Sequence, residues 1–100
     1  MNPHEFTWPV PADHPVFAGH FPGRPIVPGV VLLDEALRCT ESLLATPATG
    51  WQIANAKFLS PVGPGEILNI RVERTPRGNY SFTIRADERE VASGSLSPQS

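Results

Sequence analysis

The placement of proline is the feature that most constrains how this chain can fold. Seven of its 12 prolines lie before residue 29, and each proline fixes φ and removes a backbone N–H donor. Neither a long helix nor the inner strand of a sheet is compatible with that density. The N-terminal third is therefore predicted to be extended or turning, and a bundle of helices is disfavoured.

Length and composition leave room for a single domain. The chain has 100 residues, of which 40% are hydrophobic and 18% charged, with a net charge of −2. These values are typical of a folded chain rather than a disordered one. A chain of this length buries one core, so residues 1–100 are expected to form one domain.

Several classes of function are disfavoured by composition. Cys39 is the only cysteine, and three histidines with one cysteine offer no recognisable zinc-ligand spacing. The eight basic residues are scattered, unlike those of a nucleic-acid groove. The longest apolar run, Val30 to Leu33, is far below the roughly 20 residues of a membrane span, and the N-terminus lacks signal-peptide features. We expect a cytoplasmic protein that binds no metal, nucleic acid or membrane.

One stretch of the sequence predicts a helix. Residues 30–45 contain no glycine or proline, are rich in helix formers, and are followed by Thr46-Pro47, which ends the helix. The predicted helix is roughly 25 Å long at 1.5 Å per residue. Its apolar side chains share one broad arc, which is expected to face the core: Leu32, Leu33, Ala36, Leu37, Cys39, Leu43 and Leu44.

The remaining pattern predicts strands on both sides of the helix. Residues 5–11 read as a short edge strand because Pro9 and Pro11 cannot donate to a ladder, and 13–28 as a long ordered loop. After Gly50 the apolar period falls to two, with apolar residues at 51, 53, 56 and 58 in the first strand. The other strands are predicted at 67–72, at 80–84 and from 91 to 96, with residues 97–100 frayed. One helix with antiparallel strands indicates an α+β fold in which one sheet wraps around the helix.

The loop-helix junction resembles a known signature. Residues 19–34, GHFPGRPIVPGVVLLD, strongly resemble the motif of the FabA/FabZ-type 3-hydroxyacyl-[acyl-carrier-protein] dehydratases: a His-Phe-Pro loop, a Pro-Gly helix start and an acid fourteen positions after the histidine. His20 and Asp34 fit this pattern in type and spacing. A second block, residues 56–68, looks like the strand-turn-strand that follows the helix in this family.

The resemblance implies a fold, an assembly and a subgroup. The family fold is the hot dog, an antiparallel sheet wrapped around one long central helix, and its members dimerise so that each active site uses both subunits. We therefore expect a homodimer or a higher even oligomer, with a heterodimer as an alternative. The short chain looks more like the compact ApeI-like dehydratases of secondary lipid or aryl-polyene pathways than like the members of primary metabolism.

The resemblance also assigns roles to residues. Loss of water from a 3-hydroxyacyl thioester needs a base for the α-proton, an acid for the hydroxyl, and donors for the charge on the thioester oxygen. His20 matches the catalytic histidine, and an imidazole accepts protons near neutral pH. Asp34 matches the acid that works with the histidine of the facing subunit. The amide of Gly29, at the helix start, matches the family's oxyanion donor. No cofactor is required.

Ordinary structural roles are the alternatives for both catalytic residues. A lone loop histidine such as His20 often caps a backbone carbonyl. Asp34 would be a solvated carboxylate paired with Arg38, four residues later on the same helix. Many relatives carry Gln at the position of Arg38. A guanidinium turned toward Asp34 favours the charged carboxylate and weakens it as a proton donor. In that case Asp34 is expected to act mainly by orienting water and His20.

Substrate and carrier contacts follow from the same two blocks. Residues expected to bind the substrate are Gly29, Val30, Phe21 and Phe58. Acyl carrier proteins are acidic, and each block contains one basic residue, Arg24 in the first and Lys57 in the second. They are the first candidates for a docking patch.

Three functions are consistent with these residues. The first is a 3-hydroxyacyl-[acyl-carrier-protein] dehydratase. The second is a hot-dog acyl thioesterase in which Asp34 or Glu35 holds the attacking water, since one fold hosts several reactions. The third is a non-catalytic acyl-binding subunit of a hetero-oligomeric dehydratase. The His-Phe-Pro loop and its spacing to the acid favour elimination, and the presence of both His20 and Asp34 counts against the third.

Overall fold

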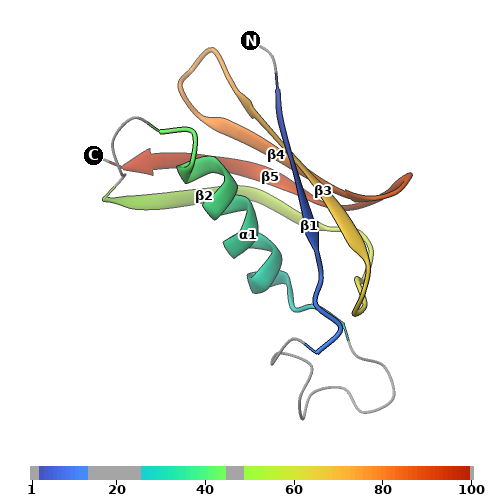
Figure 1. The fold of residues 1–100 in the computed structure, drawn as a ribbon. Coiled ribbons are helices and arrows are strands. Elements are labelled where there is room, and N and C mark those ends of the chain that lie inside the picture. The colour runs from blue at the N-terminus through green and yellow to red at the C-terminus, as the bar shows by residue number, and fades with distance from the viewer. Residues whose placement is uncertain (1–2, 14–25, 45–48, 100) are drawn as a thin grey trace.

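The elements of the fold form two layers. The computed structural model describes residues 3–13, 26–44 and 49–99 (Figure 1). In chain order the elements are β1 (His4–Pro9), α1 (Gly29–Glu41), β2 (Gly50–Phe58), β3 (Ile67–Arg74), β4 (Tyr80–Ala86) and β5 (Arg89–Gln99). The five strands form one antiparallel sheet in the order β1-β3-β4-β5-β2, and α1 lies across its concave face (Figure 1). The predicted α+β arrangement of one sheet wrapped around one helix is confirmed.

The central strands supply most of the core through their alternation. In β3 and β4, Ile70 pairs with Ile84 and Val72 with Phe82, and all four side chains are buried. The intervening Arg71 is exposed on the outer face. The largest fully buried side chains of the described residues are Phe82, Leu68, Ile70, Ile84, Leu96, Val62, Val72, Val91 and Thr40. The core thus lies between the inner sheet face and α1.

The helix contacts this core through a stripe spaced by four residues. Leu32, Ala36 and Thr40 are buried, and the flanking apolar residues of the predicted arc are partly buried against the core. Thr40 was not among the predicted core residues. Its hydroxyl donates to the carbonyl of Ala36 at 2.8 Å, and because this bond lies within the helix, the polar side chain is satisfied where it is buried.

The helix ends earlier than predicted. It stops at Glu41 rather than at residue 45, which leaves 13 residues and about 20 Å of length. The amides of Leu43 and Leu44 donate to carbonyls three residues earlier, at 3.0 and 3.1 Å. The hydroxyl of Ser42 donates to the Cys39 carbonyl at 2.6 Å. These tighter bonds replace the α-helical pattern at the end of the helix.

Two strand boundaries also differ from the predictions. β1 begins at His4 and ends at Pro9, although its place at the sheet edge is as predicted. Residues 97–99 are paired rather than frayed, with Pro98 opposite Trp51 of β2. Proline is tolerated there because β4 begins at Tyr80, which pairs with Leu96, so Pro98 has a neighbour on one side only.

The second edge strand, β2, contains a β-bulge. The register shifts by one residue between Ala54 and Lys57, and Asn55 has a φ of 56°, in the left-handed region that Asn tolerates better than most residues. The extra residue reverses the alternation, so Ile53 and Phe58 point to the same inner face. In the sequence, the apolar residues of this strand move from odd positions, 51 and 53, to even positions, 56 and 58, and the bulge lies between the two pairs.

Candidate active site

The start of α1 lies against the ring of Phe58. Gly29 is the first residue of the helix after Pro28, and a first-turn amide has no acceptor within its own helix. A Cβ on Gly29 would lie 2.9 Å from both Cε1 and Cζ of Phe58, so any larger residue displaces the ring or the helix start. The structure thus brings together two of the predicted substrate-binding residues.

An apolar cavity opens at this contact. Its volume is about 540 Å³, and its walls come from the segment before α1, the first turns of α1, the end of β2 and the residues that follow β2: Ile26, Val27, Pro28, Gly29, Leu32, Phe58, Ser60 and Pro61. Such a lining suits an apolar ligand with few polar contacts. The cavity can therefore hold an acyl chain next to the amide of Gly29.

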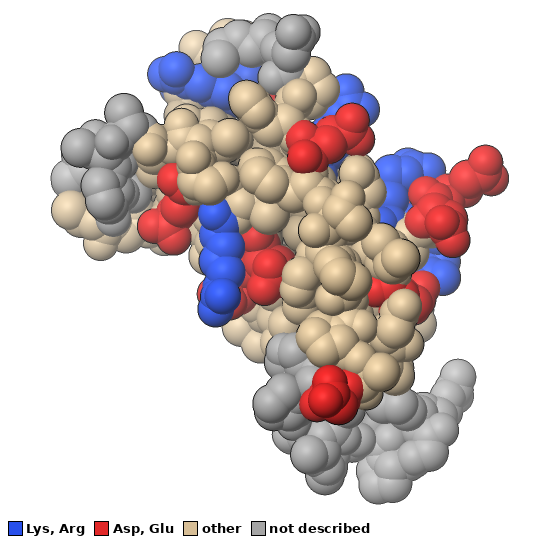
Figure 2. Space-filling view, viewed as in Figure 1, with Lys and Arg blue, Asp and Glu red and all other residues tan. Residues whose placement is uncertain are grey.

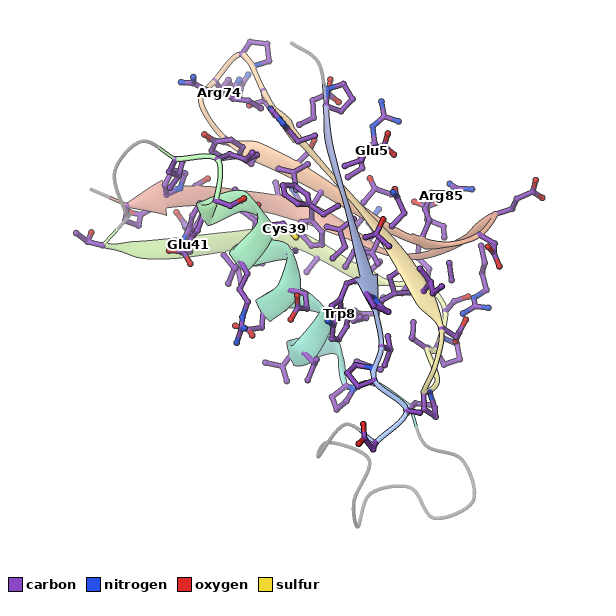
Figure 3. The ribbon with its side chains drawn as sticks, in the orientation of Figure 1. Glu5, Trp8, Cys39, Glu41, Arg74 and Arg85 are labelled. Atoms are coloured by element: carbon purple, nitrogen blue, oxygen red, sulfur yellow. The ribbon has the colours of Figure 1, made fainter. Side chains whose placement is uncertain are left out.

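Asp34 lies in a different hollow, on the outer flank of α1. This hollow, of about 480 Å³, is lined by Trp8, Pro11, Val30, Val31, Asp34, Glu35 and Arg38, and Figure 3 shows Trp8 of β1 beside the helix. Arg38 points toward Asp34, with its Nε donating to Oδ2 at 3.0 Å. Both side chains are more than half exposed, so this ion pair adds little stability. Of the two arrangements considered for Arg38, the structure therefore has the one in which the guanidinium is turned toward Asp34.

The predicted site residues are thus distributed over two surfaces of one chain. Gly29 and Phe58 share the apolar cavity, whereas Asp34 and Val30, the latter 71% exposed, share the outer hollow. The predictions for His20, Phe21 and Arg24 lie outside the described residues. Within the described part of the chain, the acid and the expected oxyanion donor do not meet.

Lys57 lies on the outer side of the sheet. It pairs with Ser93, whereas its neighbour Phe58 pairs with Ala92, and successive residues of a strand point to opposite faces. Lys57 is exposed and does not line the cavity. On the face that carries α1, Figure 2 shows acidic and basic side chains interspersed around an uncharged area.

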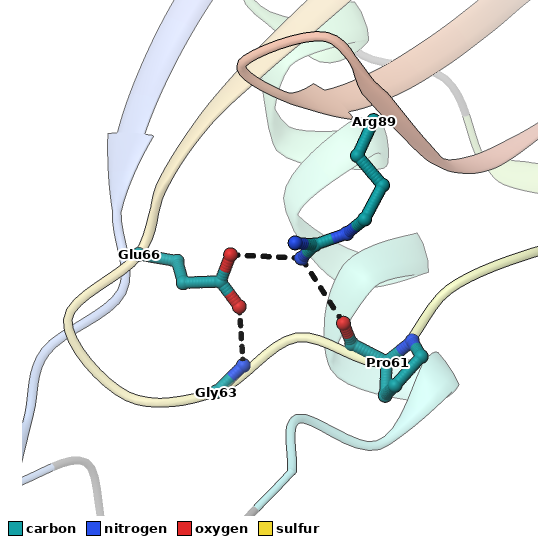
Figure 4. Close-up of polar contacts among 4 residues, drawn as sticks. All are labelled: Pro61, Gly63, Glu66 and Arg89. Carbon is teal, nitrogen blue, oxygen red and sulfur yellow. Dashed lines mark hydrogen bonds and ion pairs between the residues drawn. The ribbon is translucent and has the colours of Figure 1, made fainter.

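A polar cluster holds the connection between β2 and β3 (Figure 4). Glu66 accepts a hydrogen bond from the Gly63 amide at 2.8 Å through Oε2. Its Oε1 accepts from Nη2 of Arg89 at 2.8 Å, and the same Nη2 donates to the Pro61 carbonyl at 3.1 Å. Sequence reasoning missed this cluster because Arg89 lies 23 residues from Glu66, beyond the reach of any local pattern. The only local signal was an acid directly after Pro64-Gly65.

The cluster predicts a pH dependence of stability. The Gly63 hydrogen bond, followed by the bond and charge of Arg89, lowers the pKa of Glu66 below its ordinary 4.5. A depressed pKa contributes stability that is present above the unfolded value and is lost as pH falls through the folded value. The free energy of unfolding should therefore decline as pH falls below 4.5, and Glu66→Gln should reduce that decline.

Urea unfolding followed by tryptophan fluorescence at several pH values measures this effect. Glu73→Gln, on the exposed outer face of β3, is the matched control and should retain the wild-type slope. A Glu66→Gln variant with the full wild-type pH dependence would contradict the prediction.

The one cysteine of the sequence, Cys39, lies in the described part of the chain. Cys39 is partly buried against the core, and burial, together with the negative charge of Glu35, raises the pKa of its thiol, so the protonated form predominates at neutral pH. No three histidine, cysteine or acidic side chains gather as metal ligands among the described residues. The helix of this part of the structure is too short and polar to cross a membrane.

The fold and the cavity define the class of the protein. One antiparallel sheet wrapped around one helix, with an apolar cavity at the helix N-terminus, is a hot-dog domain. Residues 1–95 match the model of the ApeI-like family, described as ApeI dehydratase. The chain belongs to this family.

Similar proteins agree with this assignment. The chain is 41% identical over 102 residues to the 3-hydroxyacyl-[acyl-carrier-protein] dehydratase FabZ of Gluconacetobacter diazotrophicus, covering 88% of this chain and 63% of that protein. It is 36% identical over 102 residues to FabZ of Gluconobacter oxydans, covering 88% and 60%. The chain thus spans less than two thirds of either relative. Among solved structures, the dehydratase heterocomplex ApeI:P from Xenorhabdus doucetiae matches with a TM-score of 0.82 at 24% identity, over 98% of this chain and 88% of that one, which shows the shared fold.

Proposed function

We propose that residues 1–100 act as one dehydratase domain, which removes water from a 3-hydroxyacyl thioester carried on acyl carrier protein and releases a trans-2-enoyl thioester. The reaction would serve fatty-acid or related lipid or polyene biosynthesis. The observation that carries this proposal is the family match over residues 1–95, within which His20 and Asp34 keep the dehydratase spacing. The single core shared by α1 and all five strands supports one domain.

The chemistry assigns a task to each group. His20 accepts the α-proton from C2 of the substrate, and the electron pair of that C–H bond forms the C2–C3 double bond. The hydroxyl leaves C3 as water by taking this proton from the imidazolium of His20, which returns the histidine to its neutral form. The amide of Gly29 donates to the thioester oxygen while negative charge develops there. Asp34 orients the departing water and His20, in keeping with its ion pair to Arg38. The reaction needs no cofactor, because proton transfer and charge stabilisation are sufficient.

The site is proposed to use two chains, as a homodimer or a higher even oligomer. Two observations support this: Asp34 and Gly29 open onto separate hollows of one chain, and β2 lies at the sheet edge with Ile53 and Phe58 exposed by 40% and 51%. Edge strands with exposed apolar residues favour pairing with another chain. Light scattering on the active protein tests the proposal, and an active monomer would overturn it. A second hot-dog chain could replace the identical partner.

Arg24 and Lys57 are proposed to take part in docking the carrier protein. The protein is proposed to act in the cytoplasm. Lys57 is exposed and turned away from the cavity, so its charge can act on a partner without contacting the acyl chain. Lys57→Glu is expected to raise KM for the carrier-bound substrate, because exposed charges act on association. The effect should shrink with added salt, since the Debye length is about 8 Å at physiological ionic strength. A pantetheine-linked substrate should be turned over unchanged, and an equal loss with both substrates would place Lys57 in the site itself.

A mass-spectrometric assay tests the proposed reaction. The protein is incubated with a 3-hydroxyacyl carrier protein, and the mass of the carrier is followed. Loss of one water is the expected result. Release of the free hydroxy acid would instead indicate a thioesterase, and an unchanged carrier would indicate a non-catalytic acyl-binding subunit.

A further inference from the structure

We propose that Arg89 and Glu66 are positioning residues that hold the connection between β2 and β3 as a fixed wall of the apolar cavity, and so set the affinity for the thioester substrate. This inference rests on the proposed function, because it takes the cavity to be the place where the acyl thioester binds. Neither residue lines the cavity. Their effect is therefore indirect, through Ser60 and Pro61, which do.

The connection is tied to the rest of the domain on both sides of Pro61. Before it, the amides of Leu59 and Ser60 donate to the carbonyl of Val91 at 2.8 and 3.3 Å. After it, the carbonyl of Val62 accepts from the amide of Val27 at 2.7 Å. Both ties are backbone bonds that a substitution leaves in place. If the side-chain cluster is lost, Pro61, which lies between these two ties, is the residue that gains conformational freedom.

Pro61 is held within this stretch by a side chain. Its carbonyl accepts from Arg89, which stands at the start of β5, 28 residues away. Arg89 is itself aimed by Glu66, whose second oxygen is anchored by the Gly63 amide. The cluster thus links three places: Arg89 at the start of β5, Pro61 in the cavity wall, and Glu66 at the end of the connection (Figure 4). Because Arg89 and Glu66 are 44% and 32% exposed, the link restrains the wall without being part of the core.

A restrained wall lowers the cost of binding. A loop that is already in its bound conformation loses less conformational freedom when the ligand enters. This gain is the same for the bound substrate and for the transition state, so it changes KM and leaves kcat unaltered. A change in the fraction of folded enzyme would do the opposite, lowering the apparent kcat at constant KM. The two roles are therefore separable.

Arg89→Met is the first test. Methionine keeps much of the apolar stem and removes the guanidinium. KM should rise about five- to tenfold, less than the loss of a buried charge-assisted hydrogen bond would give, because both partners are partly exposed. The rise should be equal for carrier-bound and pantetheine-linked substrates, and kcat should stay within about twofold. The matched control is Arg85→Met, since Arg85 donates to the Glu88 carbonyl of its own turn and should show wild-type KM.

Glu66→Gln is the second test. A side-chain amide has one acceptor oxygen, and its NH₂ is a donor, so it can satisfy either the Gly63 amide or Arg89, not both. KM should rise with this variant, as it should with Arg89→Met. The double variant should be no worse than the more affected single variant, because both substitutions remove the same restraint.

A binding measurement separates this inference from the proposed function. The affinity of each variant for a pantetheine thioether that cannot react is measured by calorimetry, and Arg89→Met should bind about five- to tenfold more weakly than wild type. If the wild type binds the thioether but dehydrates no substrate, the proposed function fails and the affinity difference still stands. Equal affinities in folded Arg89→Met and wild type, a loss of kcat at constant KM, or no binding by the wild type would each overturn the inference.

Discussion

Replacing His20 by alanine is expected to lower kcat for dehydration by about 10²- to 10⁴-fold, the range that a general base contributes. Alanine cannot accept the α-proton, whereas the amide of Gly29 and the cavity would still bind the thioester, so KM should change little. Steady-state assays with a 3-hydroxyacyl carrier protein measure both constants. The urea midpoint should match wild type, because the sequence around His20 is rich in proline, and each proline fixes φ and reduces the conformational freedom of the unfolded chain.

The control for this variant is another histidine of the same chain. His4 is exposed on the edge strand β1, and His4→Ala should retain full activity. If a folded His20→Ala enzyme kept substantial activity, the base would have to be another group and the family motif would not describe the mechanism of this chain.

Replacing Asp34 by asparagine is the second large effect, with an expected loss of about 10²-fold in kcat, at the lower end of the general acid-base range. The amide keeps the size of the side chain but loses the charge that pairs with Arg38. Orientation of the leaving water and of His20 is then weakened, although the base itself remains. Arg38→Gln should cause a smaller loss, because it removes only the group that orients Asp34.

Two neighbouring acids serve as controls for Asp34. Glu41, exposed at the last residue of α1, provides the same change of charge at the other end of the helix, and Glu41→Gln should leave kcat unaltered. Glu35 lines the same hollow as Asp34. If Glu35→Gln abolished turnover while Asp34→Asn retained it, the acidic role would belong to Glu35.

The parts of the fold that follow from local patterns were predictable. The start of the helix at Gly29 and the alternation in β3 and β4 follow from the periodicity of apolar residues and from the position of glycine and proline. The end of the helix was not predictable, because Ser42 and the residues after it satisfy their hydrogen-bond donors within a tight turn. The pairing of Pro98 depends on how far β4 extends, which no local pattern reports.

The site was predictable to the extent that motif residues are close in sequence or share an element. Phe58 was assigned to the substrate from its position in a motif block, and the structure places its ring against Gly29. The ion pair of Asp34 and Arg38 follows from helical spacing. The cluster of Glu66, Arg89 and Pro61 could not be foreseen, because a hydrogen bond across 23 or 28 residues depends on how the turns approach one another in space.

The bulge in β2 decides which side chains of this strand face the cavity. With the extra residue accommodated at Asn55, Phe58 faces the cavity and Lys57 faces outward. If the strand kept all its residues but continued from Ile53 without the bulge, these two directions would be exchanged. A cation would then project into an apolar space, and an aromatic ring would lie on the outer face. Deleting the extra residue would instead remove the bulge and leave both side chains on their present faces. Relatives of different length in this strand are to be compared by the face on which each side chain lies, rather than by its position in an alignment.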